Sequence, residues 1–244
     1  MRNSSQLLII CAVLLTSVMQ AQWRSNQKVK GNGNVISEKR STTNYDKIAI
    51  TGFFDVELVS GKEGNITIKG EENLLPHIKI EVVNQELKIT TDKNKYISTS
   101  NGKNIVITIP FESINQVSLT GSGNISTKNT ITSDSFAAKL TGSGDLKLNV
   151  EAKNIEINLN GSGDIVLIGK TDNITSILNG SGDIKASAMK STNAKVTVSG
   201  SGDTSVFCSE SIYARVSGSG DIKYSGNPEK KDTKVNGSGD ISKS

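Results

Sequence analysis

Apolar and polar residues alternate along most of the chain after residue 45, which is typical of strands with one buried face. The alternation is most regular around the tetrapeptide Gly-Ser-Gly-Asp, or its Asn variant, which occurs seven times. Around the copy at 161–164, Leu159 and Ile165 share one parity, whereas Asn160, Ser162 and Asp164 share the other. Both glycines of the copy have the buried parity, where a missing Cβ permits a tight turn or a close approach of backbone.

The seven copies recur at nearly even spacing, which indicates one structural unit stacked on itself. The steps between them are 21, 19, 19, 20, 18 and 19 residues. Their first glycines are Gly121, Gly142, Gly161, Gly180, Gly200, Gly218 and Gly237. Leucine or valine stands two positions before each first glycine, and the position four after it is aliphatic in all copies but one, which has Thr204.

One coil of a β-helix accommodates this repeat, with successive coils about 4.8 Å apart. We therefore predict an all-β fold, a parallel β-helix (solenoid) of about 19-residue coils with Gly-Ser-Gly-Asp turns. A propeller blade usually needs about 40 residues, and a leucine-rich repeat needs a more leucine-rich pattern. The chain has no 3.6-residue period, which excludes a helical solenoid.

The chain before residue 117 divides into three parts. Residues 1–21 contain Arg2 and an apolar run from Leu7 to Val18, and they are predicted to be a secretory signal peptide cleaved after Ala21. Residues 22–44 form a polar leader. Residues 45–116 alternate less regularly and are expected to be a β cap, continuous as one domain with the regular repeats of 117–244.

Several segments before the repeats carry more specific signals. Residues 51–56, Thr-Gly-Phe-Phe-Asp-Val, look like a degenerate copy of the repeat, and residues 31–34 look like another, 21 residues before Gly52. The apolar positions in 78–82 and 87–89 predict a hairpin that turns at Asn84-Gln85. Phe53 and Phe54 add the bulk that an end coil needs to close its core.

Composition and charge argue against several classes of partner and site. The formal net charge is +4, but basic and acidic residues are interspersed, which argues against a nucleic-acid partner. No segment after the signal peptide is apolar enough to span a membrane. Once the signal peptide is removed, Cys208 is the single cysteine, so no internal disulfide can form. It is predicted to be a passive, partly buried thiol.

The aspartates of the repeat are predicted to form an outward column with neighbours roughly 5 Å apart. They are Asp145, Asp164, Asp183, Asp203, Asp221 and Asp240, with Asn124 at the start. The preferred interpretation is structural: each side chain accepts backbone N–H groups of its own turn, a role in which Asn124 would serve equally well. Lys147, Lys185 and Lys223 share the outward face and would partly compensate the charge.

Two chemical interpretations of the column remain open. Stacked Gly-Asp turns bind calcium in β-rolls, but each turn here offers one carboxylate, whereas calcium takes six to eight oxygens. Carboxylates about 5 Å apart also match a retaining glycosidase, but a catalytic pair must be chemically distinct and these copies look equivalent.

Other candidate residues give weaker signals. His77 is the only histidine, so a multi-histidine metal site or a Ser-His-Asp triad is poorly supported, and a hydrogen-bonded loop position is expected. Trp23 lies in the leader, and Tyr96, Tyr213 and Tyr224 are scattered. We predict no catalytic residue, no cofactor and no bound metal.

Several sequence segments together resemble the bacterial family described as auto-transporter adhesin, head GIN domain. They are residues 31–36 (Gly-Asn-Gly-Asn-Val-Ile), residues 45–48 with 52–58, residues 70–76 (Gly-Glu-Glu-Asn-Leu-Leu-Pro), the Gly-Ser-Gly-Asp series, and residues 224–228. The resemblance covers about residues 30–244. It implies an exported β-helical protein and carries over no catalytic residues.

We therefore expect an exported, non-enzymatic, adhesin-like binding module that presents outward polar ladders to a glycan or protein. Its expected location is the periplasm, the outer membrane surface or the medium. One alternative is a polysaccharide-degrading enzyme on the same fold. Another is a structural envelope protein that self-associates through its last coil, residues 237–244, whose sheet edge is potentially open.

Overall fold

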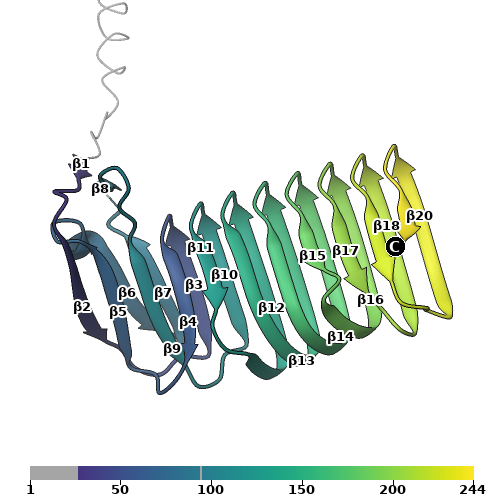
Figure 1. The fold of residues 1–244 in the computed structure, drawn as a ribbon, viewed down its shortest axis with the longest axis horizontal. Helices are drawn as coiled ribbons and strands as arrows, with labels where there is room; N and C mark the ends of the chain where they lie inside the picture. The colour runs from purple at the N-terminus through teal and green to yellow at the C-terminus, as the bar shows by residue number, and fades with distance from the viewer. Residues whose placement is uncertain (1–26, 94) are drawn as a thin grey trace, which may run out of the picture.

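The structure, a computed structural model, describes residues 27–93 and 95–244. The expected signal peptide and Trp23 lie outside these residues. The predicted parallel β-helix is confirmed: coils stack along one long axis in about seven turns about 19 residues apart, and a less regular N-terminal region lies at one end (Figure 1). Within the described residues, no helix has the length and apolar character needed to cross a membrane.

One face of the solenoid consists of strand segments that run into the first glycine of each turn and pair in parallel with their neighbours. These strands are β3 (Lys47–Gly52), β10 (Gln116–Gly121), β12 (Ile131–Gly142), β13 (Asp145–Gly161), β14 (Ile165–Gly180), β16 (Met189–Gly200), β18 (Ser211–Gly218) and β20 (Lys230–Gly237).

The other face consists of the segments that leave each turn. It contains β4 (Asp55–Ser60), β11 (Asn124–Thr127), β15 (Ile184–Ala186), β17 (Thr204–Phe207), β19 (Ile222–Ser225), β21 (Ile241–Lys243) and the first parts of β13 and β14. β13 and β14 continue around a wide corner onto the first face, so the corners and the Gly-Ser-Gly-Asp turns lie on opposite edges of the solenoid (Figure 1).

The repeat positions stack in register, and the predicted aliphatic columns fill the core. The leucine or valine two positions before each turn is buried from Leu119 to Val216. The position four after each first glycine is likewise buried from Ile125 to Ile222, with Thr204 in the middle of the column. The alternation in the sequence therefore identified the inner face correctly.

The glycines of the turn are required by contacts along the solenoid axis. A Cβ on Gly161 would lie 2.2 Å from the carbonyl oxygen of Gly142, and a Cβ on Gly163 would lie 1.8 Å from that of Gly144. The φ angle of Gly161 is +136°, which L side chains rarely adopt. The predicted close approach of backbone is confirmed, and it occurs between successive coils.

The first coil is the degenerate copy predicted at residues 51–56. Its Thr51, Gly52 and Asp55 pair in register with Thr120, Gly121 and Asn124. Beyond this coil, β7 (Glu86–Thr91) pairs with β3, and β9 (Val106–Phe111) pairs with β4, so the irregular segment continues the same sheet.

Antiparallel strands then close the N-terminal end. β6 (Ile78–Val83) forms the predicted hairpin with β7, and Asn84 and Gln85 have φ angles of 52° and 61°, as a tight hairpin turn requires. β5 (Asn65–Glu71) pairs with β9 and with β2 (Val35–Ser41), and a short 3₁₀ helix, η1 (Leu75–His77), precedes β6. β1 (Gln27–Lys30) pairs in parallel with β8 (Lys95–Ser98) in a separate two-stranded sheet.

Two expectations for residues 22–44 need correction. Residues 31–34 do not stack as a copy of the repeat, because they connect β1 to β2 and β2 pairs antiparallel with β5. The described part of the polar leader contains these two strands. The segment looked like a leader because β2 has no fully buried residue, as is common for an edge strand.

The last described coil differs from the preceding coils in its exposure and its polar side chains. Every residue of β20 is exposed. The register places Lys231 beside Ile212 and Thr233 beside Ala214, so polar side chains continue two columns that are apolar in the preceding coil. An inward-pointing charge at a sheet edge discourages pairing with another chain.

Candidate functional site

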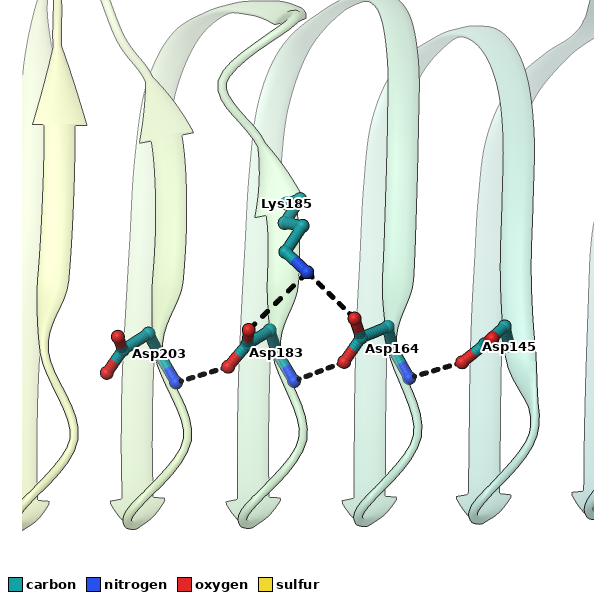
Figure 2. A network of polar contacts seen from close by, with 5 residues as sticks. All are labelled: Asp145, Asp164, Asp183, Lys185 and Asp203. Atoms are coloured by element: carbon teal, nitrogen blue, oxygen red, sulfur yellow. Dashed lines mark hydrogen bonds and ion pairs between the residues drawn. The ribbon is translucent and has the colours of Figure 1, made fainter.

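The predicted aspartate column exists and follows one edge of the solenoid. The backbone N–H of Asp164 donates to Oδ1 of Asp145 at 3.0 Å, and the N–H of Asp183 donates to Oδ1 of Asp164 at 3.1 Å. The same bond continues through Asp203, Asp221 and Asp240, at 2.8–3.1 Å. Figure 2 shows four of these residues, each carboxylate turned toward the backbone of the next coil.

These bonds correct the expected role of the aspartates. Each carboxylate accepts from the following coil, and no hydrogen bond to its own turn is present among the described residues. The N–H groups within the turn already have an acceptor, because Ser162 and Gly163 both donate to the carbonyl of Gly142. The side chain thus supplies an acceptor between coils, where the turn interrupts the regular strand pairing.

Asn124 does not take the place of an aspartate, contrary to the expectation. The N–H of Asp145 donates to the carbonyl of Gly123 instead of to Asn124. The Asn124 amide donates to Oδ1 of Asp55 at 2.8 Å, and Asn104 donates to Oδ2 of the same carboxylate. Asn124 therefore links the column to the first coil as a donor.

One lysine compensates the column directly. Nζ of Lys185 lies 2.7 Å from Oδ2 of Asp164 and 3.4 Å from Oδ2 of Asp183 (Figure 2). Lys147 and Lys223, also expected to compensate, form no ion pair with any described residue. Burial raises the pKa of Asp164, but the bonds from Lys185 and from the Asp183 N–H outweigh it, so the pKa lies below its ordinary value.

This geometry favours a structural role for the aspartates over a catalytic one. Five of the six carboxylates make the same backbone contact, which gives no distinct acid and nucleophile. A lowered pKa keeps Asp164 ionised at neutral pH, which is the wrong state for a general acid. The described residues contain no group of three His, Cys, Asp or Glu side chains placed to hold a metal ion.

A second ladder, of side-chain amides, is not evident from the sequence pattern. Asn173 donates to Oδ1 of Asn154 at 2.9 Å, Asn193 donates to Oδ1 of Asn173 at 3.1 Å, and Ser211 donates to Oδ1 of Asn193 at 2.6 Å. The polar residues around Asn154 and Asn173 suggest turns, but both asparagines lie within strands, β13 and β14. Their spacing of one coil was the signal that could have identified the ladder.

A hollow of about 830 Å³ lies at the Asn154 end of this amide ladder. Its walls are the loop with Ser113 and Asn115, the corner of β12 around Ser135, and the outward side chains of Asn154 and Asn173. A second hollow, of about 570 Å³, adjoins it along the same corner. Ser133 and Asp134 line both, and Asp134 forms an ion pair with Lys153 at 2.8 Å.

Two of the segments quoted for the family resemblance, residues 31–36 and 70–76, meet in the cap and have a structural role there. The fully buried carboxylate of Glu71 accepts bonds from the N–H of Gly33 at 2.6 Å and from both the N–H and the hydroxyl of Ser100. Burial raises the pKa of Glu71, but these bonds outweigh it and the net pKa is lowered. Residues 31–34 therefore close around Glu71.

His77 and Cys208, the only histidine and the only cysteine of the described residues, lie in surroundings that do not favour catalysis. His77 ends η1, and its Nδ1 lies 3.2 Å from Oδ2 of Asp92, as expected for a hydrogen-bonded loop residue. Cys208 is buried completely, and burial raises the pKa of its thiol. A raised pKa disfavours the nucleophilic thiolate.

The tyrosines do not form a shared platform. Tyr224 is buried and Tyr96 is 61% exposed in the cap. Tyr213 lies on the outer face of β18, where the Arg215 guanidinium lies 3.8 Å from the centre of its ring. One face of this ring is therefore covered, and Arg215 is itself bound to Asp232.

The fold is shared with solved bacterial proteins. A putative adhesin from Bacteroides fragilis is 23% identical, with a TM-score of 0.82, over 88% of this chain and 100% of that one. Two proteins from Parabacteroides distasonis are each 24% identical over 89% of this chain and 100% of theirs. One is described as a putative lipid binding protein, with a TM-score of 0.72, and the other as a putative adhesin, with a TM-score of 0.70. These identities show the shared fold alone.

No curated protein matches the chain. A family model does match it, over residues 44–228, which is most of its length and includes the first coil and six of the seven repeat copies. The chain belongs to the family described as "Putative auto-transporter adhesin, head GIN domain".

Proposed function

We propose that the protein is an exported, non-enzymatic binding module that contacts a surface glycan or protein through outward polar side chains of its coils. The solenoid is the scaffold, and repetition brings a polar residue to equivalent surface positions in successive coils. Residues 1–21 would direct export. The family description and the adhesins that share the fold support this proposal.

The observation that carries the proposal is the fixed position of the outward polar columns. Asn179 donates to Asn160 at 2.9 Å, and Asn154, Asn173 and Asn193 form a second ladder on the same face. Side chains held by their neighbours lose little conformational entropy when a ligand binds. Such a surface can contact an extended partner with repeated polar groups at a low entropic cost.

Affinity electrophoresis tests this function. The purified protein is run through gels cast with neutral or acidic polysaccharides, with and without calcium, beside a non-binding protein of similar charge. We expect retardation in one class of gel and no cleared zone along the track. A cleared zone would show an enzyme, whereas free migration in every gel would refute a glycan ligand and leave the protein-partner form to be tested by capture.

A further inference from the structure

The two adjoining hollows form a groove along the first complete corner of the solenoid. We infer that this corner groove, defined by the residues that line both hollows, binds a neutral oligosaccharide. The inference rests on the proposed binding function and specifies the place and the ligand class.

The groove exists because the coils before this corner are incomplete. β9 ends at Phe111 and the chain turns to β10 within residues 112–115, so this shorter corner contains no strand residues. Residues 131–135 of β12 consequently pair with β13 on one side only. The other side of this corner therefore has no neighbouring strand among the described residues, and the Ser135 carbonyl there accepts from the Ser133 hydroxyl.

The amide ladder adds donors at the same place. Each amide donates toward the N-terminal end, so Asn154 is the last member and its Nδ2 has no partner among the described residues. Ser135 stands beside it in the register where an asparagine would continue the ladder. A chain of aligned hydrogen bonds polarises its terminal donor, which favours an oxygen acceptor in the groove.

The lining favours hydroxyl groups over a charged ligand. Most polar groups around the larger hollow are amides and hydroxyls, including those of Asn115, Gln116 and Thr175. Its charged side chains are one lysine, Lys139, and two carboxylates, of which Asp134 is already paired with Lys153. Over both hollows, four carboxylates (Asp134, Glu151, Glu156 and Asp172) outnumber three lysines (Lys139, Lys153 and Lys170), which disfavours a polyanion. A sugar hydroxyl can both donate and accept.

The shape favours a chain of several units. The larger hollow alone has about 830 Å³, and the second extends it past Asp134 toward Lys170 and Asp172. Ile155 and Phe136 supply apolar atoms at the base of the larger hollow. A ligand with hydroxyls along its edges and C–H groups on its faces matches this combination.

Titration followed by NMR tests the inference. The isotope-labelled protein is titrated separately with cellohexaose, maltoheptaose and laminarihexaose, and with hexagalacturonate as the acidic probe. We expect at least one neutral probe to shift the backbone amide signals of Asn115, Ser135 and Asn154. Loss of one hydrogen bond in Asn154→Ala should weaken that binding about fivefold.

Asn193→Ala is the matched control. It breaks the same amide ladder, but Asn193 does not line the groove, so affinity should stay within about twofold of the parent. Equal weakening by both variants would overturn the inference, since the ladder would then act only through the fold. Shifts confined to another face would overturn it and leave the proposed binding function standing.

Three further results would refute the neutral ligand class, the groove itself or the glycan form of the proposed function. Binding of hexagalacturonate alone would refute the neutral class. If no oligosaccharide shifts the groove signals, the inference fails. If the polysaccharide gels also cause no retardation, the glycan form of the proposed function fails with it.

Discussion

The regular coils and the N-terminal cap use the same strands but satisfy their polar groups differently. In the coils, each residue meets its counterpart one coil away, and the Asp column bridges the turns in five successive steps. In the cap, β5 and β6 pair antiparallel with their neighbours, and loop N–H groups donate to carboxylates. Tyr45 donates its N–H to Glu63 at 2.8 Å, as Gly33 and Ser100 do to Glu71.

Glycine is required for different reasons in these two regions. Stacking identical turns brings backbone against backbone, so a repeat glycine has no space for a Cβ in the axial direction. A cap glycine can have ample space and still be needed for its φ angle, as at Gly102, where φ is +73° and a Cβ would meet nothing within 4 Å. Repetition therefore makes each coil dependent on its neighbour, whereas Gly102 is needed for its φ angle alone.

The largest expected effect is that of Gly163→Ala. Its Cβ would lie 1.8 Å from the carbonyl oxygen of Gly144, and backbone on both sides cannot move without breaking the register. We expect a loss of about 4 kcal/mol or more in the free energy of unfolding. Denaturant unfolding followed by circular dichroism measures it.

Gly102→Ala is the matched control in the cap. It imposes only the left-handed backbone cost on an L residue, about 1–2 kcal/mol. A similar loss for both variants would show that φ, and not the contact between coils, limits the repeat glycines.

Glu71→Gln should have the next largest effect. Two donors from Ser100 and one from Gly33 converge on the two carboxylate oxygens, and an amide would turn an N–H₂ group toward one of them. We expect a loss of about 2 kcal/mol in the free energy of unfolding. The exposed Glu72→Gln should change stability little by comparison, and an equally large loss there would contradict this account.

Asp164→Ala should cost less, because the site is partly open to water. The N–H of Asp183 loses its acceptor, which is worth about 1 kcal/mol. Asp164→Asn keeps an oxygen at the same place and should lose a smaller amount. If Asn and Ala are equally harmful in thermal unfolding, the ion pair with Lys185 is the dominant interaction.

The pH dependence provides a separate test of this column. Because the folded-state pKa of Asp164 is lowered, its ionised form stabilises the fold above the pKa of an unfolded aspartate, about 3.9. The contribution is lost as pH falls through the lower, folded-state pKa. The parent protein should therefore lose more thermal stability below pH of about 4 than Asp164→Asn does.

The solenoid could be predicted from sequence because each coil is an independent example of the same pattern. Seven copies fixed the period, the buried parity and the place of the turns, and the register even placed Thr51 beside Thr120 as expected. In the cap each strand and turn occurs only once, so no second copy could support an assignment from sequence. Residues 31–34 resembled a repeat by composition, and only the pairing of β2 with β5 shows that they close around Glu71.

The aspartate column could be located from sequence, but its bonding partner could not. Whether a carboxylate accepts from its own turn or from the next coil depends on which N–H groups are already occupied, and that follows from the backbone path at Gly142. The corner groove could not be predicted from sequence either, since it results from the shorter corner of the preceding coil, at residues 112–115. Asn154 carried a periodic signal, but polar residues before a strand are also typical of a turn.

Thr204→Val should stabilise the protein. Thr204 is 1% exposed in a column between Ile184 and Ile222, and its hydroxyl has no partner among the described residues. Removing a buried hydroxyl that makes no hydrogen bond should gain about 1 kcal/mol. Thr171→Val, whose hydroxyl donates to the Lys153 carbonyl, should instead be destabilising in the same thermal assay.

The smallest expected effect concerns the C-terminal end, where Lys231→Ile would complete an apolar column. The parent has a positive side chain beside Ile212 on β20, and we expect this charge to discourage the edge of β20 from pairing with a second copy. Sedimentation over a range of concentrations should show a monomeric parent and weak, concentration-dependent association of the variant. Lys234→Ile alters the outer face of the same strand, beside Arg215, and should remain monomeric.

Association of both variants would mean that the added apolar surface alone drives the association. Association of the parent would show that the end coil is an interface, and the contrast between a closed cap and a charge-protected end would not hold.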